Sequence, residues 1–234
     1  MSARITLISS MATRTVLADL ARDFSTRAGI EVSVESVGGV DAAKRVQAGE
    51  GFDVVLLASE AIDRLIASGH LQGPRWDLIR STVAVAVRSG TPHPDIHDGD
   101  AVRQAVLAAP SISYSTGPSG TYLTHLFERW GIADQVRDRM VQAPPGVPVG
   151  SLVAKGDVAL GFQQLSELLP MSGIDVVGEL PPDIKYVTTF CAARGLLSDQ
   201  AHGPAHDATV TRWLEFLRSA QAADTIRRHG MTPA

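Results

Sequence analysis

Small hydroxyl-bearing residues and glycines stand at four places where a short apolar segment of the chain gives way to a helix-like pattern. These junctions lie within residues 5–14, 52–60, 112–121 and 158–166. A helix begins with unpaired backbone N–H groups and a partial positive charge. Small polar side chains placed there can therefore bind an anion without a metal ion or a dedicated cation. The chemistry that these spacings favour is the binding of a small anion.

The hydroxyl and glycine residues at these junctions are the first candidate ligand contacts. Ser9 and Ser10 end the first apolar segment, Ser59 follows the second, and Ser119 and Gly120 belong to a Gly-Pro-Ser-Gly segment after the third. Each serine alone could simply cap a helix, and the Gly-Pro-Ser-Gly segment could be only a tight turn. Their recurrence at successive junctions favours ligand binding.

Charged residues near the junctions add weaker candidates. Arg14 follows the first junction and could bind a carboxylate through two parallel hydrogen bonds. Lys44 and Arg45 follow a pair of glycines near a presumed loop, although all three cations are also compatible with a solvated surface. The weak candidates for a general base are Glu167, Tyr114 and Lys44, and no pair of carboxylates is arranged for acid–base catalysis.

The composition excludes several classes of function. The chain has 234 residues, 44% of them hydrophobic and 20% charged, with a net charge of −4. That is an ordinary globular composition without the basic patch of a nucleic-acid-binding protein. Phosphate-binding glycine loops, CxxC pairs and a GxSxG element are absent from the sequence, so we predict no cofactor and no nucleic-acid partner.

Histidines and the single cysteine do not form a convincing metal or redox site. The pairs His93 with His97 and His202 with His206 have a zinc-compatible spacing, but both lie in segments rich in proline or glycine and lack the HExxH pattern. Cys191 has no partner for a disulfide within the chain and is predicted to be a small buried residue. We therefore predict no metal site.

The N-terminus bears on where the protein works. No basic region, long apolar stretch and cleavage site precede the first strand-like segment, and no stretch is long enough to span a membrane. We expect a cytoplasmic protein if Met1 is the native start, and a periplasmic one if a signal has been removed.

Strand and helix patterns alternate along the chain, which predicts an α/β fold with parallel sheet covered on both faces. The expected strands cover residues 5–9, 31–36, 53–57, 82–87, 111–114, 140–142, 158–162, 175–177 and 186–193. The expected helices cover residues 15–28, 41–48, 60–68, 101–108, 121–130, 150–155, 165–169, 208–219 and 222–228.

Two extended runs, residues 82–87 and 186–193, bracket the middle third of the chain. We interpret them as two crossings between lobes. Lobe 1 then comprises residues 1–82 with 194–234, and lobe 2 comprises residues 83–193. In such folds the ligand binds at the carboxyl ends of the strands, so a cleft between the lobes is expected.

In the order of these elements, the chain resembles the molybdate-binding-protein-like family of bacterial substrate-binding proteins. The resemblance covers nearly the whole chain and is strongest at Ser9-Ser10 and over residues 53–59, 146–150 and 155–162. It implies a two-lobed, periplasmic-binding-protein-like fold of type II, with two mixed sheets flanked by helices and a hinge of two crossing strands. It also implies a monomer.

The same resemblance implies where an oxyanion would be held. Serine hydroxyls and backbone N–H groups at the strand–helix junctions form the contacts in that family. Carried over position by position, the implied contacts in this sequence are Ser10, Ser59, Ser119 or Gly120, and Val147.

One departure from the family pattern bears on the ligand. Molybdate-binding members usually carry a tyrosine after the glycine of the strand that contains Gly161, whereas Gln163 and Gln164 stand here. An amide offers both a donor and an acceptor, which suits an organic di- or tricarboxylate better than a symmetrical oxyanion. We expect one of the two glutamines to contact the ligand.

Two classes of function remain open. The first is a binding protein for a small anion, which would deliver its ligand to a membrane transporter if it were exported. The alternative is a cytoplasmic isomerase or tautomerase, similar to aconitate isomerase, that moves a double bond in an unsaturated carboxylic acid. An intracellular sensor or storage protein for an oxyanion is a third reading, although no DNA-binding helix-turn-helix accompanies it.

Overall fold

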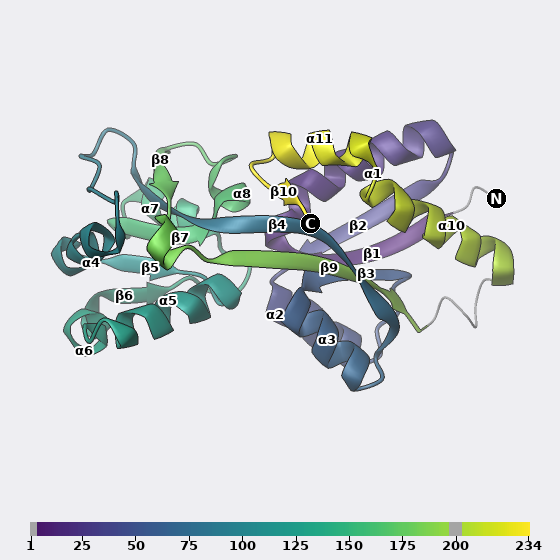
Figure 1. Ribbon diagram of the computed structural model, residues 1–234, viewed down its shortest axis with the longest axis horizontal. Helices are drawn as coiled ribbons and strands as arrows, with labels where there is room; N and C mark the ends of the chain where they lie inside the picture. The colour runs from purple at the N-terminus through teal and green to yellow at the C-terminus, as the bar shows by residue number, and fades with distance from the viewer. Residues whose placement is uncertain (1–3, 197–202) are drawn as a thin grey trace. The chain divides into compact units, whose positions relative to one another are not determined.

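The computed structural model describes residues 4–196 and 203–234 and divides the chain into two units (Figure 1). Unit 1 comprises Met1–Arg80 with Thr189–Ala234, and unit 2 comprises Ser81–Thr188. Both boundaries fall inside long strands, β4 (Leu71–Arg88) and β9 (Val187–Gly195), which are therefore the two crossings. The sequence interpretation placed the boundaries after residues 82 and 193.

The sheet of unit 1 is mixed. Three neighbouring parallel strands lie in the order β2 (Glu31–Val37), β1 (Arg4–Ser10) and β3 (Val54–Ala58). Strand β9 then pairs antiparallel with β3, and the short β10 (Thr232–Pro233) pairs antiparallel with β4.

Helices cover both faces of this sheet (Figure 1). A short 3-10 helix, η1 (Met11–Thr13), leads into α1 (Arg14–Ala28), which packs on one face with α10 (Gly203–Leu217) and α11 (Ala220–Arg228). The other face carries α2 (Gly39–Gln47) and α3 (Ser59–Ala67).

The apolar run of β3 shows why this strand must be covered on both sides. Side chains alternate across a strand, and Val54 and Leu56 accordingly join the core under α1 and α10, whereas Val55 and Leu57 join the core under α2 and α3. Trp213 of α10 is fully buried in the first of these cores.

Unit 2 repeats the same plan. Its parallel strands lie in the order β6 (Met140–Gln142), β5 (Ile112–Tyr114) and β7 (Leu160–Gln164). Strand β4 pairs antiparallel with β7 and also with β8 (Ile174–Glu179).

The helices of unit 2 also cover two faces. One apolar core contains residues of α4 (Gly99–Ala108), α5 (Pro118–Arg129) and α6 (Ala133–Val136), and the other contains residues of α7 (Val149–Lys155) and α8 (Leu165–Leu168). The remaining 3-10 helices are η2 (Arg137–Arg139) and η3 (Pro182–Ile184). Mixed α/β architecture in two units is thus confirmed.

Several element boundaries differ from the sequence prediction. Strand β4 begins eleven residues earlier than expected, because the partly exposed polar residues after Leu71 hide its strand character. Helix α6 and strand β10 were not predicted, since both are too short to show periodicity. Strand β7 runs two residues further, to Gln164, which places both glutamines inside the strand. Within the described part of the chain, no helix has the length and apolar character needed to cross a bilayer.

Candidate functional site

The carboxyl ends of β1, β2 and β3 form one edge of the unit 1 sheet, which we call the unit 1 edge. Ser9 lies opposite Ser36 of β2 and Leu56 of β3, and the hydroxyls of the two serines are 2.7 Å apart. After this edge β1 leads into η1 and α1, β2 into α2, and β3 into α3. Because all three strands are parallel, three helices begin at one edge.

The structure places three of the predicted serines at this edge. Ser9 and Ser10 end β1, and Ser59 is the first residue of α3. The start of α2 lies against Ser10, since a Cβ added to Gly39 would come within 3.6 Å of the Ser10 Cβ. The hydroxyls and the helix starts therefore belong to one local arrangement within unit 1.

The helices that begin at the unit 1 edge have no side-chain caps within the described residues. Ser10 holds the N-cap position of η1 without capping it, and Gly38 and Ala58 hold those positions in α2 and α3. Two other helices differ. Asp98 caps α4 by accepting a first-turn amide at 2.8 Å, and Ser219 caps α11 at 3.1 Å. The simple capping interpretation therefore does not account for Ser10 or Ser59.

Ser10 is the most telling residue of this edge. It is only 8% exposed, and its Oγ is buried with no hydrogen-bond partner in the described part of the chain. A buried hydroxyl without a partner lowers stability, and such groups are uncommon in native proteins. Neither η1 nor α1 carries an acidic residue in its first turn, whereas α2 and α3 carry Asp41 and Glu60. The Ser10 hydroxyl and the start of η1 are therefore the part of this edge best suited to an anionic ligand.

The carboxyl ends of β5, β6 and β7 form an equivalent edge in unit 2, which we call the unit 2 edge. Tyr114 lies opposite Gln142 of β6 and Phe162 of β7, and its ring packs on the apolar core under α5. Strand β5 leads into α5, where the buried Ser119 lies with its hydroxyl 3.1 Å from that of Ser115. This hydroxyl pair joins the end of β5 to the first turn of α5.

Two predicted backbone contacts already have partners within their own turns. The Gly120 N–H donates to the Gly117 carbonyl at 3.0 Å, and the Val147 N–H donates to the Pro144 carbonyl at 3.0 Å. Gly120 is needed for another reason, because an added Cβ would lie 1.8 Å from the Ser115 carbonyl oxygen. Its lack of a side chain lets α5 pack against the preceding turn.

The two glutamines of β7 are buried, with 2% and 3% exposure for Gln163 and Gln164. Gln164 donates its Nε2 to Thr188 Oγ1 at 2.6 Å, and its Oε1 is buried without a partner among the described residues. Gln163 uses both ends of its amide: Oε1 accepts from the Gly150 N–H at 3.3 Å, and Nε2 donates to Glu167 Oε1 at 2.8 Å. Gln163 therefore binds protein groups at both ends.

Glu167, a weak candidate for a general base in the sequence, has an unusual environment. It lies in α8, partly covered, and burial raises the pKa of its carboxyl to about 7, while the hydrogen bond from Gln163 opposes that rise. Burial disfavours the charged form, whereas a donor favours it. An acid whose pKa is near neutrality can both take up and release a proton under ordinary conditions.

The cationic candidates lie on exposed helix surfaces or in ion pairs with glutamates. Arg14 is exposed as the first residue of α1. Lys44 is exposed in the last turn of α2, which begins at Gly39, two residues before the helix predicted over residues 41–48. Arg45 binds Glu35 and Glu50, and its hydrogen bonds lower the pKa of both carboxyls.

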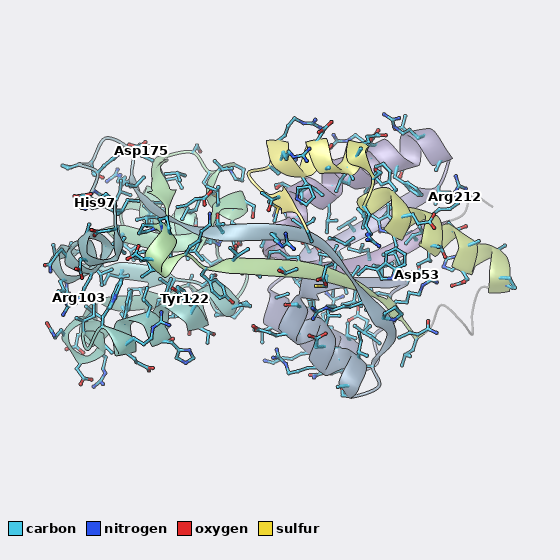
Figure 2. The ribbon with its side chains drawn as sticks, viewed as in Figure 1. Asp53, His97, Arg103, Tyr122, Asp175 and Arg212 are labelled. Atoms are coloured by element: carbon cyan, nitrogen blue, oxygen red, sulfur yellow. The ribbon has the colours of Figure 1, made fainter. Side chains whose placement is uncertain are left out.

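Three of the four histidines with zinc-compatible spacing contact carboxylates. His93 and His97 each bind aspartates on the surface of unit 2. His206 lies in α10, with its Nε2 2.7 Å from Oδ1 of the buried Asp53 (labelled in Figure 2), and His202 lies outside the described residues. Among the described residues, no group of three His, Cys, Asp or Glu side chains gathers as metal ligands would.

Sequence reasoning missed two hydroxyl residues of these edges, Ser36 and Ser115. Each lies at or just after the end of a parallel strand, next to a serine that was predicted. The available signal was their position, since Ser36 ends the expected strand over residues 31–36 and Ser115 directly follows the one over residues 111–114.

Two α/β units joined by two long strands, each with helices that begin at its parallel strand ends, define the class of two-unit solute-binding folds. The chain belongs to the family of bacterial extracellular solute-binding proteins, which it matches over residues 5–232. The resemblance to molybdate-binding-protein-like members of this class is confirmed.

The chain is similar to proteins with two different named functions. It is 36% identical over 238 residues to an aconitate isomerase from Pseudomonas sp., covering 98% of this chain and 87% of the relative. It is 21% identical to the molybdate-binding protein ModA of Escherichia coli K12, covering 98% and 89%. The solved periplasmic molybdate-binding protein of Azotobacter vinelandii has the same fold, with a TM-score of 0.77, 19% identity and coverage of 97% and 98%.

Proposed function

We propose that this chain binds a small organic di- or tricarboxylate at helix starts that carry no side-chain cap. The observation that carries the proposal is the buried Ser10 Oγ, which has no hydrogen-bond partner within the described residues and lies beside the starts of η1 and α2. An anion there would give the Ser10 hydroxyl a hydrogen-bond partner and would lie at helix starts, which favour negative charge.

The preference for a carboxylate over a metal oxyanion has two supports. The relative named for an unsaturated tricarboxylate is 36% identical, whereas the molybdate-binding relative is 21% identical. The exposed Arg14 at the start of α1 offers a planar guanidinium, which matches a carboxylate in two parallel bonds. A molybdate-like oxyanion is the competing ligand.

A second function is favoured by Glu167. An isomerase that moves a double bond in an unsaturated carboxylic acid needs a base beside the carbon that loses a proton, and the pKa of this carboxyl is about 7. The aconitate isomerase similarity points to the same reaction class. As a binding protein the chain would act as a monomer, and it would serve a membrane transporter only if exported.

Isothermal titration calorimetry on the intact chain tests the ligand class. The panel comprises citrate, cis-aconitate, trans-aconitate and tricarballylate, set against molybdate, tungstate and sulfate. We expect micromolar or tighter binding of at least one tricarboxylate and weaker binding of the inorganic oxyanions. Tight molybdate binding together with no heat from any carboxylate overturns the proposal.

A further inference from the structure

The geometry points to Glu167 as the group that moves the proton in such an isomerisation, with Gln163 as the residue that positions it. This inference rests on the second function proposed above and assigns its proton-transfer residue. The two residues are joined by the 2.8 Å hydrogen bond from Gln163 Nε2 to Glu167 Oε1.

The orientation of the Gln163 amide follows from its partners. The Gly150 N–H can only donate, so the glutamine oxygen must face it, and the NH2 group must then face Glu167. Gln163 is held in β7 by pairing with Ala84 of β4, and it is almost fully buried. A side chain held in this way fixes the carboxyl group that it contacts.

One carboxylate oxygen of Glu167 is left for proton transfer. Oε1 accepts the bond from Gln163, whereas Oε2 has no hydrogen-bond partner among the described residues and the side chain remains partly exposed. The elements packed on α8 are β7, α7 and β8, whose charged residues are Lys155, Asp175 and Glu179. None of these three charges is a cause of the raised pKa, which comes from burial and is opposed by the Gln163 bond.

Groups that can hold a substrate carboxylate lie at the same unit 2 edge. Strands β5 and β7 end side by side, and the Ser115 and Ser119 hydroxyls follow β5 at the start of the twelve-residue helix α5. This helix carries no acidic residue in its first turn. The unit 2 edge therefore combines donors for an anion with a titratable acid.

The proposed step balances without a co-reactant. The Glu167 carboxylate takes a proton from the methylene carbon next to a substrate carboxylate, which breaks one C–H bond. The freed electron pair forms a double bond to the neighbouring carbon, while the pair of the original double bond moves to the far carbon. That carbon takes the proton back from Glu167, so one C–H bond forms and the carboxylate is regenerated.

Proton NMR of cis- and trans-aconitate incubated with the intact protein in D2O measures this step directly. We expect wild-type protein to exchange or interconvert the substrate, and Glu167→Gln to slow that reaction by about 10²–10⁴-fold, the usual contribution of a general base. The matched control is Glu128→Gln, which makes the same change at an exposed residue of α5 and should leave the rate unchanged.

The positioning role of Gln163 is tested by a separate measurement, the pH dependence of the rate. Gln163→Met removes the donor that favours the charged form of Glu167, so the midpoint of the pH–rate profile should move to higher pH. A carbon-13 titration of the Glu167 carboxyl should move in the same direction. An unchanged midpoint overturns the positioning role of Gln163.

The outcomes separate this inference from the functions on which it rests. If no carboxylate binds, the proposed ligand class fails. If carboxylates bind without exchange in wild-type protein, the isomerase function and this inference fail while carboxylate binding stands. If wild type exchanges and Glu167→Gln exchanges equally fast, only the role of Glu167 fails. Circular dichroism checks each variant, and if Glu167→Gln does not fold, Glu167→Asp is used, for which an unchanged rate overturns the role.

Discussion

The two strand-end edges are built on the same plan but differ in the chemistry of their side chains. The unit 1 edge presents neutral hydroxyls, including the unpartnered Ser10 Oγ, beside helices without side-chain caps. The unit 2 edge adds an acid whose pKa is about 7 and a glutamine that contacts it. The two edges therefore differ in that unit 2 carries a titratable carboxyl next to its strand ends, whereas Ser10 of unit 1 carries a buried hydroxyl without a partner among the described residues.

A second contrast separates helices by their starts. Helices α4 and α11 are capped by Asp98 and Ser219, whereas those that begin at the unit 1 edge are not capped by side chains within the described residues. A cap removes the hydrogen-bonding capacity that an anion would use. Stability and ligand binding should therefore depend on different helix starts, which the following variants test.

The largest expected effect comes from Ser10→Asp. A carboxylate at this position lies among the helix starts of the unit 1 edge and repels a bound anion by about 4 kcal/mol at 4 Å and an effective dielectric constant of about 20. We expect a loss of affinity of roughly 10²–10³-fold by calorimetry. The free energy of unfolding combines an N-cap gain of about 1 kcal/mol with the opposing cost of burying the carboxylate, so urea denaturation accompanies the calorimetry. Unchanged affinity would remove the unit 1 edge from the binding site.

The next effect is the pH dependence that Glu167 imposes on stability. Its folded-state pKa of about 7 lies above the ordinary glutamate value of 4.5, so the native state holds more protons than the unfolded state between these values. The free energy of unfolding therefore falls as pH rises through this window, by on the order of 3 kcal/mol. Glu167→Gln should be more stable than wild type by about that amount at pH 8.5 and equally stable at pH 4.

Urea denaturation at the two pH values measures this difference, with Glu128→Gln as the control. Glu128 is exposed on α5, so its substitution should change stability equally little at both pH values. A wild-type protein whose stability relative to Glu167→Gln does not vary with pH would show that the carboxyl titrates as an ordinary exposed glutamate.

A smaller effect distinguishes capping serines from ligand-binding serines. Ser219→Ala removes the cap of α11 and should lower the free energy of unfolding by about 1 kcal/mol without changing anion affinity. Ser10→Ala removes no cap and should change stability by less than about 0.5 kcal/mol, because it eliminates an unpartnered buried hydroxyl.

In calorimetry the same two variants should rank the other way: Ser10→Ala should weaken ligand binding more than Ser219→Ala does. Ser10→Ala should weaken ligand binding by roughly tenfold, the value of one hydrogen bond to a charged group. If Ser10→Ala loses stability as Ser219→Ala does and keeps its affinity, Ser10 acts as a structural serine.

The smallest effect is expected at Arg14. The side chain is exposed, so an ion pair with a carboxylate ligand is screened and contributes between about 0.2 and 1 kcal/mol. Arg14→Ala should weaken tricarboxylate binding by about two- to fivefold, and the difference should shrink as salt is raised from 50 to 500 mM. A larger effect that persists in high salt would place Arg14 in a buried, two-bond contact.

Much of the framework could be read from local patterns. The apolar run before Ser59 predicts a strand covered on both faces, and the turn containing Ser119 and Gly120 predicts a helix start at a strand end. The same patterns failed where the signal is short or mixed. The polar residues of early β4 hid a strand, and the glycines before Lys44 suggested a loop where α2 already begins.

The amino-acid sequence by itself determined the α/β alternation, the two crossing strands and the serines at strand ends, because each depends on spacings of a few residues. Only the tertiary structure decided what those residues contact. Ser9 meets Ser36 across 27 positions, and Gln163 receives the Gly150 N–H across 13. The pKa of Glu167 likewise depends on burial by neighbouring elements, so no local spacing could have distinguished it from an exposed glutamate.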